Sequence, residues 1–252
     1  MNFAILNEVF ASIQGEGPRI GERHIFVRFQ GCDMRCSYCD TPTAIANEDG
    51  AGGREFCSVQ VSHELSVSRE RISNPVSDSL LSELCSKLVV SGPSVPMISL
   101  TGGEPLMQHE FLATWLPQAR RKFRILLETS GIHAEFMALL NDFVDVVAMD
   151  FKLPSATGLR SYWDEHRKFL LSAARTDVYA KAVVTRTTSL SDVLNAVRLI
   201  AEVDCTIPLI LQPASGNLKP DPQMLVDFQE DALGIISDVR VIPQAHKILN
   251  VP

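Results

Sequence analysis

The sequence predicts an α/β fold in which buried parallel strands alternate with amphipathic helices. Two observations support this class: short apolar runs rich in β-forming residues recur along the chain, and helical patterns separate most of them. The chain has 252 residues, of which 46% are hydrophobic, enough for a full core and too many for a disordered chain. We therefore expect a parallel sheet or a partial barrel.

Seven apolar runs are predicted to be strands. They cover residues 24–30, 97–101, 124–128, 144–150, 178–184, 208–212 and 239–242. Three segments carry apolar residues at helical spacing and are predicted to be helices. They centre on Leu80 to Leu88, on Phe136 to Phe143 and on Val193 to Ile200, the last with Ser189 or Ser191 as its N-cap.

Residues 44–79 interrupt this alternation. They are rich in glycine and serine, and only Val59 and Val61 indicate a short strand. We expect an elaborated excursion within a single domain that spans residues 1–252, rather than a separate domain. The segment after the last strand, residues 243–252, is expected to be a C-terminal tail.

Composition and charge favour small-molecule chemistry. The formal net charge of −7 argues against a broad nucleic-acid surface. No window approaches about 20 uninterrupted apolar residues, so we expect no membrane span. The first residues lack the basic and long apolar regions of a secretory signal, which predicts a cytoplasmic protein.

Three cysteines, Cys32, Cys36 and Cys39, lie close together with the spacing Cys-x3-Cys-x2-Cys. Clustered thiols in a cytosolic chain more often bind metal than form disulfides. Three thiolates suit a 4Fe–4S cluster with one iron left open, since full ligation takes four cysteines. A structural zinc site needs a fourth ligand, and the nearest histidine, His24, lies in a predicted strand. Spacing alone favours the cluster and leaves zinc or chance spacing open.

The cysteine loop resembles the signature of the radical S-adenosylmethionine (SAM) enzymes, in which an aromatic residue, here Tyr38, precedes the third cysteine. Thr101-Gly102-Gly103-Glu104-Pro105 resembles the SAM-binding element of the same superfamily. The resemblance implies an incomplete TIM-type barrel of parallel strands with a reduced helix complement. It also implies that SAM chelates the open iron and that Glu104 accepts hydrogen bonds from the SAM amino group.

Within that superfamily the chain closely resembles the 7-carboxy-7-deazaguanine synthase family. The resemblance lies in residues 8–17 (EVFASIQGEG), 28–32 (RFQGC) and 39–41 (CDT), and continues through 128–131, 150–152, 212–213 and 246–252. It implies a carbon–nitrogen lyase that converts 6-carboxy-5,6,7,8-tetrahydropterin into 7-carboxy-7-deazaguanine, a precursor of 7-deazapurines such as queuosine. A 5′-deoxyadenosyl radical would take the hydrogen from carbon 6, and ring contraction with loss of ammonia would follow.

The same resemblance implies a substrate site. Glu16 and Gln14 offer groups that match the hydrogen-bonding edge of a pterin, and Arg28 can hold its carboxylate as a bidentate pair. Gly15 and Gly17 would permit a turn with positive φ. The expected substrate-binding residues are Ile13, Gln14, Gly15, Glu16, Arg28, Thr101, His246 and the terminal carboxylate of Pro252.

Cofactor residues follow from the family motifs in the same way. No catalytic side chain is expected beyond the cluster and SAM, and Thr41 would supply a hydroxyl to Mg²⁺, a cation that prefers oxygen ligands. The expected SAM contacts are Tyr38, Cys39, Asp40, Gly103, Glu104, Glu128, Ser130, Asp150, Phe151, Lys152, Gln212, Pro213, Ala214 and Ser215.

The family also implies a flavodoxin-like or other one-electron donor and a homodimer. Two alternatives remain at this stage. A glycyl-radical-activating enzyme shares the Cys-x3-Cys-x2-Cys loop but acts on a protein partner. A non-catalytic zinc-binding domain is the alternative from another class of protein.

Overall fold

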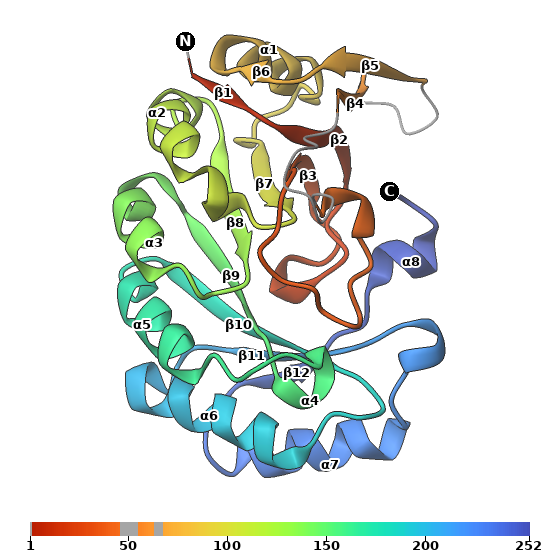
Figure 1. Cartoon of the computed structure of the whole chain (residues 1–252), viewed down its shortest axis with the longest axis vertical. Helices are drawn as coiled ribbons and strands as arrows, with labels where there is room; N and C mark the ends of the chain where they lie inside the picture. The colour runs from red at the N-terminus through yellow and green to blue at the C-terminus, as the bar shows by residue number, and fades with distance from the viewer. Residues whose placement is uncertain (1, 46–54, 63–67) are drawn as a thin grey trace.

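A ten-stranded, mostly parallel sheet forms the centre of the computed structural model, which describes residues 2–45, 55–62 and 68–252 (Figure 1). Its order is β12-β11-β10-β9-β8-β7-β3-β2-β4-β5. All seven predicted strands are present, and each pairs in parallel with its neighbours among the seven. They are β3 (Arg23–Phe29), β7 (Met97–Gly102), β8 (Arg124–Thr129), β9 (Val146–Phe151), β10 (Asp177–Val184), β11 (Leu209–Pro213) and β12 (Val239–Val241).

Three further strands extend the sheet beyond β3, and two of them come from chain regions that the sequence did not predict as strands. β2 (Leu6–Ile13) is antiparallel to β3, β4 (Phe56–Gln60) is parallel to β2, and β5 (Arg69–Ser73) is antiparallel to β4. A separate pair joins β1 (Phe3–Ala4) to β6 (Val76–Ser77). The predicted short strand at 59–61 is therefore β4, whereas β2 and β5 were missed.

The excursion at 44–79 thus adds two strands to the sheet edge. Its residues 46–54 and 63–67 lie outside the described residues, and its assignment to a single domain stays a prediction. At the two ends of the strand order, β12 and β5 have no pairing with each other among the described residues. The sheet is therefore open, as expected for a partial barrel.

Helices follow most of the parallel strands, and most of them lie along one side of the sheet (Figure 1). Ser77 and Ser189 cap two of them, accepting hydrogen bonds from Leu80 and Asp192, so Ser189 and not Ser191 is the N-cap. The helices are α1 (Asp78–Lys87), α2 (His109–Ala119), α3 (Ala134–Leu140), α4 (Pro154–Thr157), α5 (Trp163–Ala173), α6 (Leu190–Asp204), α7 (Pro222–Leu233) and α8 (Ala245–Leu249).

The three predicted helices correspond to α1, α3 and α6. The sequence did not predict α2, which contains Pro117, or α5 and α7, which bury few large apolar side chains. Eight α-helices against twelve strands among the described residues confirm the reduced helix complement. No helix in this part of the chain is both long enough and apolar enough to cross a membrane.

Alternation along β10 shows how the sheet separates its core from its site. Ala180 and Ala182 belong to the hydrophobic core between the sheet and the helices. Tyr179, Lys181 and Val183 point to the opposite face and line a cavity there. That face carries a small apolar cluster and the loops that build the candidate site. The segment after β3 and helix α8 lie on this side of the sheet (Figure 1).

Candidate active site

A cavity of about 700 Å³ lies at the carboxyl ends of the parallel strands. Four parts of the chain line it: the loop after β2, the cysteine loop after β3, the ends of β7 to β11, and the C-terminal segment. The carboxyl ends of barrel strands are where loops from several strands converge, which makes this end the usual site of chemistry. Its size suits one or two small organic molecules.

The cysteine loop lines one wall of the cavity with all three of its cysteines. Cys32 and Cys36 are partly buried, and Cys39 is exposed. Ser37 fastens the loop to α4, because its backbone N–H donates to Thr157 at 3.0 Å and its hydroxyl to Ala156 at 2.7 Å. Burial raises the pKa of the Cys32 thiol to about 11. The raised pKa favours the protonated thiol. A bound metal would favour the thiolate instead, because the thiolate is the form that ligates it.

This cysteine arrangement fits an iron–sulfur cluster better than a single zinc ion. Among the described residues, no three His, Cys, Asp or Glu side chains converge on one point as a single ion requires. In a cubane cluster each thiolate ligates a different iron, so the three sulfurs do not share one point. Cys32, Cys36 and Cys39 nevertheless face the same cavity.

Polar residues at the strand ends supply the wall next to the cysteines. Ser130 follows β8, Asp150 lies on β9, and Gln212 lies on β11. Each lines the cavity and has a buried side-chain oxygen with no hydrogen-bond partner among the described residues. Buried polar atoms are normally paired, so such a group of unpaired oxygens fits the binding of a polar ligand. The predicted SAM contacts that line this cavity are Tyr38, Cys39, Asp40, Gly103, Glu128, Ser130, Asp150, Lys152, Gln212, Ala214 and Ser215.

Three predicted SAM contacts lie outside the cavity lining. Phe151 points to the helix side, where its ring packs edge-on against His166. Pro213 ends β11 without reaching the lining. Glu104 is 1% exposed, and its role toward SAM stays a prediction, as do the roles of the other two.

The buried carboxylate of Glu104 holds the end of β8 instead. Oε1 accepts hydrogen bonds from the Thr129 hydroxyl at 2.8 Å and the Leu106 amide at 3.1 Å, and Oε2 accepts from the Ser130 amide at 2.7 Å. An ionised carboxylate can accept about four hydrogen bonds. The three internal bonds therefore fix where the carboxylate lies.

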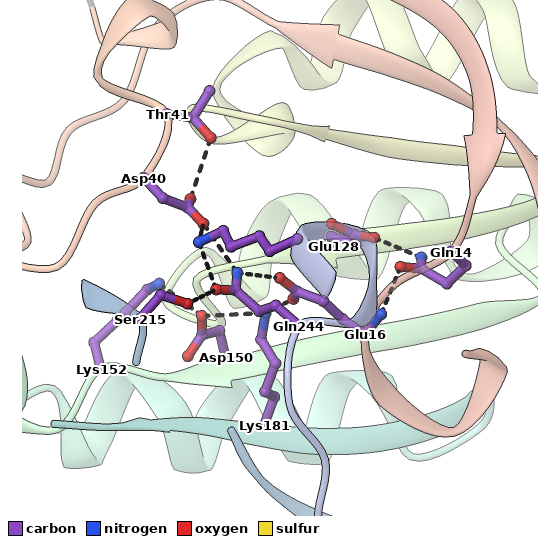
Figure 2. A network of polar contacts seen from close by, with 11 residues as sticks. Gln14, Glu16, Asp40, Thr41, Glu128, Asp150, Lys152, Lys181, Ser215 and Gln244 are labelled. Atoms are coloured by element: carbon purple, nitrogen blue, oxygen red, sulfur yellow. Dashed lines mark hydrogen bonds and ion pairs between the residues drawn. The ribbon is translucent and has the colours of Figure 1, made fainter. Parts of the chain in front are cut away.

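On the opposite wall, the loop after β2 presents Gln14 and Glu16 (Figure 2). Gln14 donates to Glu128 at 2.9 Å and accepts from the Glu16 amide at 3.1 Å. Glu16 accepts from Lys181 at 2.5 Å and from Gln244 at 2.7 Å. Burial alone would raise the pKa of Glu16, but the Lys181 ammonium and the Gln244 amide outweigh it and hold the pKa below its usual value. Glu16 is therefore an ionised acceptor at neutral pH.

The two glycines of this loop serve different purposes. Gly17 has φ of +66°, and a Cβ there would meet the ring of Tyr179. Gly15 has no positive φ, so that part of the prediction was wrong. What Gly15 provides is close approach: a Cβ there would collide with His246, and its carbonyl accepts a hydrogen bond from the Ala245 amide at 2.9 Å.

The C-terminal segment closes this side of the cavity. His246 and Pro252 both line it, and their contact with the substrate stays a prediction. Gln244 donates to Asp40 at 2.9 Å, and Lys247 donates to the same carboxylate at 2.8 Å. The segment is thus fastened to both the cysteine loop and the loop after β2 (Figure 2).

Arg28, Thr41, Ile13 and Thr101 also line the cavity. Arg28 donates through Nε to Glu8 at 2.8 Å. The Thr41 hydroxyl donates to Asp40 at 3.3 Å, and its contact with Mg²⁺ stays a prediction.

Sequence reasoning missed Lys181, Gln244 and Lys247. The sequence does indicate a special role for Lys181. It is the single charged residue in the buried part of an apolar strand, and a buried lysine requires polar or acidic partners. Gln244 and Lys247 gave no signal, because their partners lie more than two hundred positions earlier in the chain.

Comparison with known proteins assigns the family. The sequence pattern of the radical SAM superfamily matches residues 26–213. The 7-carboxy-7-deazaguanine synthase of Geobacter sulfurreducens is 38% identical over 255 residues, covering 98% of this chain and 97% of that protein. The synthase of Methanopyrus kandleri is 35% identical, covering 96% and 92%.

Two solved structures share the fold. The crystal structure of QueE from Escherichia coli matches with a TM-score of 0.59 and 21% identity, covering 95% of this chain and 94% of that one. TYW1 with a bound lysine–pyruvate adduct matches with a TM-score of 0.51 and 11% identity, covering 84% and 74%. With the cysteine loop, the strand-end residues and the full-length relatives in agreement, the chain belongs to the radical SAM superfamily and, within it, to the 7-carboxy-7-deazaguanine synthase family.

Proposed function

We propose that this protein converts 6-carboxy-5,6,7,8-tetrahydropterin into 7-carboxy-7-deazaguanine with loss of ammonia, as a step towards 7-deazapurines such as queuosine. The observation that carries the proposal is the meeting of three segments in one cavity: the loop with Gln14 and Glu16, the cysteine loop, and the C-terminal segment with His246. The relatives that bear the synthase name match the chain almost end to end, so these segments belong to the aligned length.

Cys32, Cys36 and Cys39 would hold the 4Fe–4S cluster, and the strand-end residues from Ser130 to Gln212 would hold SAM. When bound, the cluster and SAM together supply a 5′-deoxyadenosyl radical that removes a hydrogen atom from the substrate. The residues of the chain itself hold the cluster and SAM in fixed positions relative to each other. Ser37 anchors the cysteine loop, and Glu104 fixes the end of β8 beside it. Fixed positions of this kind are what a reaction between two bound molecules requires.

Glu16 would bind the amino-pyrimidinone edge of the pterin. Its carboxylate accepts from Lys181 and Gln244, and acceptor positions remain on both oxygens for substrate N–H groups. Because Lys181 keeps Glu16 ionised, the hydrogen bonds to substrate would be charge-assisted. The Pro252 carboxylate would also accept hydrogen bonds from the pterin, and His246 lines the same cavity.

Thr41 would contribute one hydroxyl to Mg²⁺, with substrate oxygens and water as the other ligands. Support for this comes from the position of Thr41 on the cavity wall and from the neighbouring Asp40 carboxylate, which favours a cation nearby. Asp40 would also orient the loop, because it accepts hydrogen bonds from Gln244 and Lys247.

A one-electron donor, flavodoxin-like or of another kind, would reduce the cluster. The exposure of Cys39 supports access from solvent to this loop. The family resemblance further supports a homodimer, which light scattering would test. A cytoplasmic location is proposed because thiolate-bound iron needs a reducing compartment.

The experiment that tests the proposal is a turnover assay under anaerobic conditions. Reconstituted protein is incubated with SAM, a chemical reductant and the carboxylated tetrahydropterin, and 7-carboxy-7-deazaguanine is measured by mass spectrometry. We expect product and ammonia in equal amounts. Cleavage of SAM without that product would contradict the proposed substrate and would favour an activase acting on a protein.

A further inference from the structure

Two arginines share one glutamate beside the cavity. Oε1 of Glu8 accepts a hydrogen bond from Nε of Arg28 at 2.8 Å, and Oε2 accepts from Nη1 of Arg69 at 2.5 Å. Glu8 and Arg28 line the cavity, whereas Arg69 does not. Two guanidinium cations and one carboxylate leave the group with a single net positive charge.

The sheet fixes this group in place. Glu8 lies directly opposite Arg28 in the antiparallel pair of β2 and β3, and Phe10 lies opposite Phe26 two positions along. The two phenyl rings stack with centroids 5.1 Å apart. The guanidinium groups of Arg28 and Arg69 lie 5.9 and 5.1 Å from the centroid of Phe10. Both arginines therefore rest on the same aromatic surface.

Charge balance indicates what Arg69 contributes. Arg28 and Glu8 alone would form a neutral pair, and the nearby negative charge of Glu8 would offset part of the attraction of Arg28 for an incoming carboxylate. Arg69 offsets Glu8 and restores the net positive charge. The three side chains are 18–34% exposed, so water screens these interactions only in part.

Arg28 also has guanidinium N–H groups that can donate hydrogen bonds to a ligand. Its Nε is used on Glu8, while within the described parts of the chain neither Nη1 nor Nη2 donates a hydrogen bond to another protein group. A guanidinium that presents this edge can bind a carboxylate with two parallel hydrogen bonds.

We propose that Arg69 is a positioning residue that neutralises Glu8 and so lets Arg28 bind the carboxylate of the pterin substrate. The inference rests on the proposed function and deepens it by assigning a specificity role to β5. It also gives the excursion at 44–79 a purpose, since that segment brings Arg69 to the edge of the sheet.

Binding in the absence of turnover tests this role. The reconstituted enzyme is titrated with 6-carboxypterin and with pterin, which lacks the carboxylate, and each Kd is measured by fluorescence. Arg69→Gln is expected to weaken 6-carboxypterin binding roughly tenfold and to leave pterin binding unchanged. Arg69→Lys should retain most of the preference. The matched control is Arg71→Gln, on the same strand, where the arginine rests on Phe56 away from the cavity.

A second change separates charge balance from packing. Glu8→Gln combined with Arg69→Gln removes one charge of each sign, and we expect it to recover most of the lost 6-carboxypterin affinity. The inference is overturned if Arg69→Gln weakens both ligands equally, if it behaves as Arg71→Gln does, or if the double variant shows no recovery. Failure of the proposed function is a different result: wild-type enzyme that does not prefer 6-carboxypterin to pterin and forms no deazaguanine product.

Discussion

Nζ of Lys181 lies 2.5 Å from Oε2 of Glu16 and 3.8 Å from Oδ2 of Asp150. One buried ammonium therefore joins the loop proposed to bind the pterin to the strand proposed to bind SAM (Figure 2). Burial alone would lower the pKa of Lys181, but the two carboxylates outweigh it and raise the pKa above its usual value. Lys181 is thus charged at neutral pH and holds the two halves of the cavity at a fixed separation.

Lys181→Met is expected to lower the free energy of unfolding by about 3 kcal/mol, because Glu16 would remain mostly buried without its cation partner. The KM for the pterin should also rise, since Glu16 loses the partner that positions it. Chemical denaturation and steady-state kinetics measure the two effects. Lys168→Met, at an exposed position on α5, is the control and should change neither. Equal behaviour of the two variants would contradict the role given to Lys181.

His166 gives the protein a predicted sensitivity to mild acid. It is fully buried between the Gly131 carbonyl, 3.0 Å from Nδ1, and the Lys152 amide, 3.1 Å from Nε2. Burial lowers the pKa of His166 to about 4. In the unfolded chain the same group has a pKa of about 6.5, so below that pH the unfolded state binds more protons and stability falls as the pH falls.

Between pH 7.5 and pH 5.5 this residue alone is expected to remove about 1.4 kcal/mol from the free energy of unfolding. The measurement is urea unfolding at both pH values for the wild type and for His166→Gln. The variant has no imidazole to protonate, so its loss over the same interval should be smaller by that amount. Parallel pH dependences in the two proteins would show that His166 does not titrate in this way.

Gly15→Ala is expected to displace His246, because the added methyl group would occupy the position of the imidazole. Substrate KM should rise at least about tenfold, the usual scale for a misplaced binding group, while iron content stays unchanged. Gly92→Ala is the control, since a Cβ at Gly92 meets nothing within 4 Å. The prediction fails if the two substitutions have the same effect on KM.

A short extension after Pro252 is expected to weaken pterin binding, because Pro252 lines the cavity and an extension removes its carboxylate. The same extension at the N-terminus is the control. Figure 1 shows the two ends well apart, with the N-terminus at the start of β1 and the C-terminus after α8. An unchanged Michaelis constant in the C-terminal fusion would remove Pro252 from the substrate site.

Local patterns predicted much of this structure. The central parts of β3 and of β7 to β11 are apolar runs, so their burial on both faces could be predicted from the residue types alone. The cysteine spacing predicted one shared object for three thiols, and the three residues do line one cavity. These features depend on neighbours in the sequence.

What the sequence could not predict depends on distant partners. β5 (RERIS) is mostly exposed and charged, and it is a strand because β4 pairs with it. Glu104 follows a strand at a ligand-binding motif, yet its carboxylate turns inward because the Thr129 hydroxyl and Ser130 amide are there to bind it. Gln244 and Lys247 acquire their place only when the C-terminal segment meets Asp40.

The central claim is that Cys32, Cys36 and Cys39 hold a cluster on which turnover depends. Its most direct test is iron content and product formation in anaerobically reconstituted wild type, Cys36→Ser and Cys205→Ser, the last an exposed cysteine outside the site. We predict about four irons per chain and 7-carboxy-7-deazaguanine formation in wild type and Cys205→Ser, with product lost in Cys36→Ser. Iron-free wild-type protein, or full turnover in Cys36→Ser, would contradict it.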